Sequence, residues 1–180
     1  MLRITVPETE LFDESRGEFI IVKKQNLKLE HSLVSLSKWE SKWKKPFLVK
    51  DEKTTPETID YIKCMTVTQN VDDNVYRCLD NKSLIQIKNY ITDEMTATTF
   101  NDVQKKGGRK ETITSELVYY WMVALNIPFE CQKWHLNRLL VLINICNIKN
   151  SPPKKMRRNE VLQRNASLNA ARRKALNSRG

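Results

Sequence analysis

The sequence predicts a mainly α-helical protein: a multi-helix bundle with a small N-terminal β-hairpin or short sheet and a basic C-terminal helical arm. Three observations predict it. The first thirty residues alternate apolar and polar side chains, the middle of the chain repeats apolar residues every three or four positions, and the last thirty are strongly basic. We therefore divide the 180 residues into a β element (1–32), a helical body (33–150) and a basic arm (151–180), which makes one compact domain with a tail.

The β element is predicted from three short segments. Leu2–Val6 and Leu27–Leu29 alternate, and Phe19–Val22 is rich in β-branched residues. Residues 13–15 and Gly17 supply turn material between them. These segments therefore predict a hairpin or a three-stranded element.

The first helix is expected from about residue 37. Ser37 and Glu40 have the spacing of a capping box, and Pro46 would stop the helix after about two turns. Trp39 and Trp43 lie four residues apart and share one face. They either pack on the body or form an exposed aromatic docking patch.

Three further helices follow. Thr55 followed by Pro56 is a typical helix start, and apolar spacing predicts helices over 72–79 and 83–95. Residues 100–111 contain two glycines and read as a surface loop. The repeat of the 83–95 helix consists of Leu84, Ile87 and Ile91.

The strongest core signal is a pair of apolar segments. Ile113–Leu125 is apolar on nearly every side, which predicts a central helix. Pro128 ends it, and Glu130–Ile148 resumes the helical pattern. We expect an antiparallel pair at the centre of the fold.

Motifs for catalysis or cofactor binding are not found in the sequence. Neither His31 nor His135 belongs to a metal-binding pattern, and Cys131 four residues before His135 is better explained by packing than by catalysis. We expect no enzyme activity, no cofactor, no metal, no export signal and no membrane span. The cysteines are expected to be reduced thiols of a cytoplasmic protein: Cys64, Cys78, Cys131 and Cys146.

The net charge of +10 is concentrated in the arm. Residues 151–180 hold nine basic residues against Glu160, a net +8, and the other 150 residues carry only +2. Val161, Leu168 and Ala175 lie seven apart, but the arm has no aromatic residue for base stacking. Its role stays open between a solvated tail, a docking helix for a protein and a contact with nucleic acid. The cations are Lys154, Lys155, Arg157, Arg158, Arg164, Arg172, Arg173, Lys174 and Arg179.

A set of whole segments occurs in a fixed order along residues 33–180: Ser37–Trp43, Lys45–Leu48, Tyr61–Thr66, Met95–Thr98, Glu116–Leu125, Ile127–Cys131, Trp134–Leu139 and Arg164–Arg173. Together they resemble the tail assembly chaperones of long-tailed bacteriophages. The resemblance covers most of residues 33–180.

The resemblance implies a virus-encoded helical protein of the host cytoplasm. It would bind the tape measure protein, keep it from aggregating and help to recruit tail tube subunits, with self-association possible and no membrane involved. We expect its apolar groove near Trp39, Trp43 and the 113–148 pair. The expected partner-binding residues are Trp39, Trp43, Tyr120, Trp134, Lys154, Lys155, Arg157, Arg158, Arg164, Arg172 and Arg173.

Two alternatives remain. A permanent virion protein, such as a minor tail or neck component, would use the β element to add strands to a neighbouring sheet. A nucleic-acid-binding accessory protein would use the basic arm.

Overall fold

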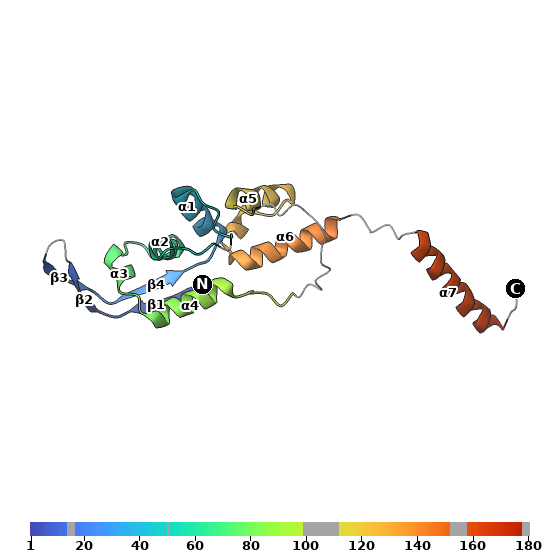
Figure 1. The fold of residues 1–180 in the computed structure, drawn as a ribbon, viewed down its shortest axis with the longest axis horizontal. Helices are drawn as coiled ribbons and strands as arrows, with labels where there is room; N and C mark the ends of the chain where they lie inside the picture. The colour runs from blue at the N-terminus through green and yellow to red at the C-terminus, as the bar shows by residue number, and fades with distance from the viewer. Residues whose placement is uncertain (14–16, 50, 99–111, 152–157, 178–180) are drawn as a thin grey trace. The chain divides into compact units, whose positions relative to one another are not determined.

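The computed structural model describes residues 1–13, 17–49, 51–98, 112–151 and 158–177. The chain separates into two compact units, Met1–Asn147 and Ile148–Gly180. Most of the described residues are helical, and an antiparallel ribbon stands at the N-terminus (Figure 1). The predicted mainly α fold class with an N-terminal hairpin is therefore confirmed.

The ribbon is one long hairpin with an interruption. Its strands are β1 (Leu2–Val6), β2 (Thr9–Asp13), β3 (Glu18–Val22) and β4 (Gln25–Leu29). Val6 pairs with Gln25 and Thr9 pairs with Val22, so the register runs unchanged across the gap. Pro7 lies in the gap and lacks the N–H that a continuous ladder would need. The strand β2 was not predicted, and residues 14 and 15 of the expected turn lie outside the described residues.

One face of β1 and β4 belongs to the core. Ile4, Val6, Leu27 and Leu29 are buried, and the residues between them are exposed. The chain after the second helix extends this ribbon, because the Val67 N–H donates to the Lys28 carbonyl at 2.8 Å. The part of the hairpin formed by β1 and β4 is thus held by the helices.

The helix α1 (Leu33–Trp43) begins four residues earlier than predicted. Ser32 is the N-cap: its hydroxyl accepts from the Ser35 N–H, and the Ser35 hydroxyl accepts from the Ser32 N–H at 2.9 Å. The capping box expected at Ser37 and Glu40 is wrong. A box at Ser32 and Ser35 satisfies the free donors first, so Ser37 lies within the helix.

The two tryptophans of α1 join it to α2 (Thr55–Met65). The Trp39 indole N–H donates to the Glu57 carbonyl at 2.9 Å, and that of Trp43 donates to Asp60 Oδ2 at 2.8 Å. Trp39 is 1% exposed. The packing alternative therefore holds for Trp39, and an exposed docking patch does not. The cap of α2 is Thr54, one residue before the predicted Thr55.

Glu40 is buried in the middle of the body. Its carboxyl oxygens accept from the Phe47 N–H at 2.8 Å and from the Ser115 N–H at 2.7 Å. Ser115 is the first residue of α5 (Ser115–Ala124), so an acidic group meets the positive end of that helix. The contact ties α1 both to the chain that follows it and to a helix 75 residues away.

Two helices with aspartate caps follow α2. They are α3 (Asp73–Arg77), capped by Asp72, and α4 (Asn81–Thr92), capped by Asp80. Both helices were predicted, with boundaries that differ by one to three residues. The loop predicted over residues 100–111 lies entirely outside the described ranges.

The two apolar segments form helices that are shorter than predicted. α5 packs on α1, and its Tyr120 is 65% exposed, so this helix is not buried on every side as its composition predicted. The second segment forms α6 (Leu136–Asn150). A short 3₁₀-helix, Phe129–Lys133, precedes α6. The predicted continuous helix is interrupted because the Leu136 N–H donates to the His31 carbonyl at 2.7 Å, which extends the chain there.

The second unit contains α7 (Arg158–Leu176). None of its side chains is buried.

Glu40→Gln will lower the free energy of unfolding by about 1–3 kcal/mol, because an amide NH₂ would face one of the two buried N–H donors. Urea unfolding followed by circular dichroism measures this. The control is Glu94→Gln, at an exposed acidic residue, which should change stability by less than about 0.5 kcal/mol. Equal stability of both variants would contradict the role of Glu40.

Candidate functional site

An apolar groove of about 870 Å³ lies between α2 and α4. Both helices place apolar side chains along it: Tyr61 and Ile62 come from α2, and Leu84, Ile87 and Ile91 come from α4. The volume lies within the roughly 300 to 1,000 Å³ of pockets that enclose a ligand. The groove can therefore receive several apolar side chains of a partner.

The floor of the groove is a stacked pair of rings. Phe47 lies on Tyr61 with ring centroids 3.9 Å apart. Trp39 packs T-shaped against both rings, with its centroid 5.1 Å from that of Phe47 and 6.5 Å from that of Tyr61. The Lys53 ammonium lies 4.5 Å from the Phe47 ring centre. Because Phe47 is also held through its N–H by Glu40, the floor is positioned before any partner arrives.

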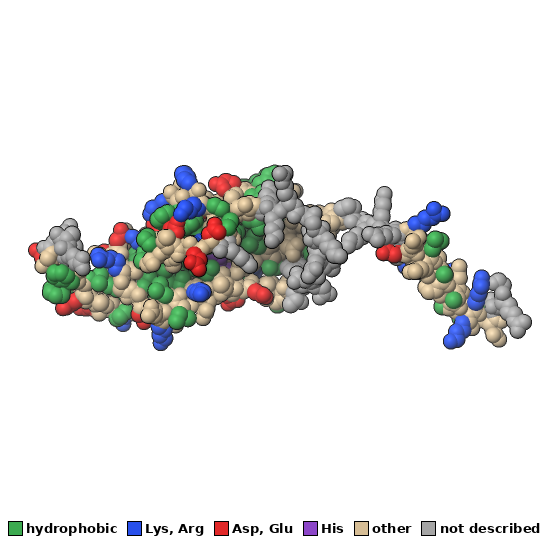
Figure 2. Space-filling view, viewed as in Figure 1, with side chains coloured by type: hydrophobic (Ala, Val, Ile, Leu, Met, Phe, Trp, Pro, Cys, Tyr) green, Lys and Arg blue, Asp and Glu red, His purple; other side chains and the backbone are tan. Residues whose placement is uncertain are grey.

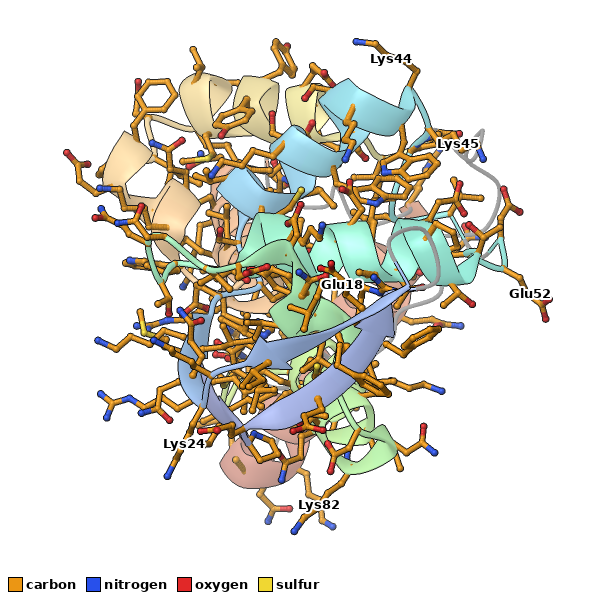
Figure 3. The ribbon with its side chains drawn as sticks, turned by 90° about the vertical axis from the view of Figure 1, so that its left-hand side faces the viewer. Glu18, Lys24, Lys44, Lys45, Glu52 and Lys82 are labelled. Atoms are coloured by element: carbon orange, nitrogen blue, oxygen red, sulfur yellow. The ribbon has the colours of Figure 1, made fainter. Side chains whose placement is uncertain are left out.

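The rim of the groove is polar. Lys53, Asp51 and Glu52 line it from the segment between α1 and α2, and Lys88 lines it from α4. Figure 3 shows Glu52 extending outward from that segment and Lys82 at the beginning of α4. An apolar floor inside a charged rim is suited to the apolar face of an amphipathic helix.

The sequence led us to expect a groove near Trp39, Trp43 and the 113–148 pair. The hollow beside Trp39 is smaller, about 270 Å³, and charged side chains such as Lys45 and Glu57 line it. Lys45 Nζ lies 2.7 Å from Glu57 Oε1, and the pKa of Glu57 is lowered to about 2 by this lysine and by the Thr54 N–H. This ion pair stabilises the N-terminal cap of α2. Its charges do not suit the binding of an apolar helix.

The other predicted partner-binding residues are dispersed. Trp43 and Trp134 are half-buried, and the Arg138 guanidinium lies 4.5 Å from the Trp134 ring centre. Tyr120 is exposed on α5. Lys154, Lys155 and Arg157 lie outside the described residues, whereas four arginines are exposed on α7: Arg158, Arg164, Arg172 and Arg173.

A second cluster joins two buried histidines. The rings of His31 and His135 lie 5.1 Å apart, and both residues are at least nine-tenths buried. His135 Nε2 donates to the Tyr90 carbonyl at 2.9 Å, and its buried Nδ1 has no hydrogen-bond partner among the described residues. His31 Nδ1 lies 2.5 Å from the Tyr61 hydroxyl.

This cluster connects four parts of the first unit. His31 follows β4, His135 precedes α6, Tyr61 belongs to α2 and Tyr90 to α4. Burial, together with the neighbouring His135, lowers the pKa of His31 to about 3. Because both rings are buried and contact residues of several elements, we interpret the pair as a packing junction. No local pattern in the sequence reveals this cluster, because the two histidines are 104 positions apart.

Neither a metal site nor a membrane span is found within the described ranges. No group of three or more His, Cys, Asp or Glu residues in them could hold a metal ion. The helices there are all too short or too polar to cross a bilayer. The four cysteines are free thiols.

Comparison of the chain with protein-family models, with curated proteins and with solved structures finds no match. A function is therefore inferred from the residues and their arrangement.

Acidification from pH 6.5 to 4.5 will destabilise the protein, partly through His31. In the unfolded chain His31 is protonated near its ordinary pKa of 6.5, whereas in the folded chain it is protonated only near its lowered pKa of about 3. One proton taken up only by the unfolded state lowers the free energy of unfolding by about 1.4 kcal/mol per pH unit. Glu57 affects stability at lower pH: its stabilising contribution is lost as the pH falls from its ordinary pKa of 4.5 to its folded pKa of about 2.

Urea unfolding at a series of pH values measures this effect. His31→Asn removes the titrating ring, so its free energy of unfolding will depend less steeply on pH than that of the wild type. Parallel pH profiles of the two proteins would show that His31 does not contribute.

Proposed function

We propose that this protein is a tail assembly chaperone of a long-tailed bacteriophage. It binds the tape measure protein in the host cytoplasm and keeps it soluble while tail tube subunits are recruited. The observation that carries the proposal is the apolar groove between α2 and α4, with its preformed aromatic floor. The segments of residues 33–180 that resemble this family support it as well.

The partner would bind through one face of a helix. Apolar side chains at positions three and four apart would enter the groove beside Leu84 and Ile91, and polar ones would remain at the rim near Lys53 and Lys88. Each apolar side chain removed from water contributes roughly 1.5–3 kcal/mol, and association entropy offsets much of that. Binding at one groove is therefore weak and reversible, which suits a chaperone that must release its client.

The second candidate is a permanent virion protein, and the β2–β3 part of the ribbon favours it. Phe12 and Phe19 form an exposed cross-strand pair with ring centroids 5.1 Å apart, and Ile21 beside them is 61% exposed. Figure 2 shows hydrophobic side chains at this end of the first unit. An exposed ribbon with apolar side chains can extend a neighbouring sheet.

Leu84→Lys will reduce recovery of the tape measure protein in co-purification by at least about tenfold, because an ammonium would then lie in the apolar groove. The matched control is Ile85→Lys on the same helix. Ile85 is 59% exposed and does not line the groove, so this variant should bind like the wild type. Equal recovery with both variants would contradict a binding site in the groove.

Co-expression with the tape measure protein of the same phage tests the function itself. A soluble complex is expected for the full chain, and a version truncated after Asn150 will show what the arm adds. A tape measure protein that stays insoluble, combined with this chain in purified particles by mass spectrometry, would favour the virion component.

A further inference from the structure

The helix α7 exposes every side chain that the structure describes. Five of these side chains are cationic, and Glu160 is the one acidic residue among them. Arg172, Arg173 and Lys174 follow one another, so they point in directions about 100° apart around the helix axis. The charge therefore surrounds the helix instead of marking one face. The five cations are Arg158, Arg164, Arg172, Arg173 and Lys174.

The apolar residues of α7 do not form a continuous seam. Val161 and Leu168 share a face, but Arg164 lies between them on that face and Arg172 follows one turn later. Leu162 and Leu176 lie on another side of the helix, 58% and 76% exposed. A coiled-coil partner requires an uninterrupted apolar stripe, which this arrangement lacks.

We propose that α7 binds the phosphodiester backbone of nucleic acid. Charge complementarity carries the proposal: the arm has nine cations against one acidic residue, whereas the rest of the chain is nearly neutral. Nineteen helical residues extend about 28 Å. A cylinder with cations on several sides can meet phosphates on both walls of a nucleic-acid groove.

The side chains of α7 further specify how it binds. The helix has no aromatic residue on which a base could stack, but it carries uncharged amides that donate to phosphate and sugar oxygens. Recognition therefore concerns the backbone and depends steeply on salt. RNA and DNA share this chemistry. The amides are Asn159, Gln163, Asn165 and Asn169.

The test is fluorescence anisotropy with the full chain across a salt series. The probes are a 30-nucleotide single-stranded RNA and a 30-base-pair DNA, with polyglutamate as an acidic polypeptide of similar charge. One variant replaces Arg172, Arg173 and Lys174 by Gln. The control variant replaces three exposed ribbon lysines by Gln and so has the same net charge: Lys23, Lys24 and Lys28.

The α7 variant should lose at least about tenfold in affinity at low salt. Its slope of log affinity against log salt should fall by about 2 for RNA and about 3 for duplex DNA, and the tighter probe identifies the nucleic acid. The ribbon variant and a variant with Arg172→Lys and Arg173→Lys should bind like the wild type. Unchanged binding by the α7 variant, an equal loss in the ribbon variant, or tighter binding of polyglutamate would overturn the proposal.

Discussion

The buried carboxyl group of Glu40 is the contact on which the arrangement of the first unit depends. An acidic group enclosed by the body is tolerated only where both oxygens find donors, and here they accept from Phe47 and Ser115. The first of these bonds fixes the ring that forms the floor of the groove, and the second fixes the beginning of α5. A single side chain in α1 thus determines both the position of a neighbouring turn and the docking of a distant helix.

The groove follows from this arrangement. Trp39 and Trp43 hold α2 against α1 through their indole N–H groups, and the histidine pair joins α2 and α4 to the chain before α6. The two walls of the groove are therefore supported by buried and partly buried hydrogen bonds. A groove that exists before its partner arrives loses less entropy on binding, which makes weak and reversible contacts useful.

Charge and apolar surface are separated along the chain. The body is nearly neutral and has the apolar groove, whereas the arm concentrates the positive charge. Apolar contacts act only at short range, but charge acts over about a Debye length and accelerates encounters with a polyanion. Our two proposals assign these surfaces to different partners: a helical protein for the groove and nucleic acid for α7.

The sequence by itself determined the fold class, most of the helices and the division of charge, because caps, apolar spacing and composition act over a few residues. It failed where a local pattern competed with a distant contact. Glu40 has the spacing of a capping residue, yet it binds Ser115, and Ile113–Leu125 is apolar all round, yet Tyr120 stays exposed. Leu84, Ile87 and Ile91 were evident as a helix face, but only the tertiary structure decided that Phe47 and Tyr61 meet this face as a groove. The same holds for His31 and His135, since no local pattern connects residues so far apart.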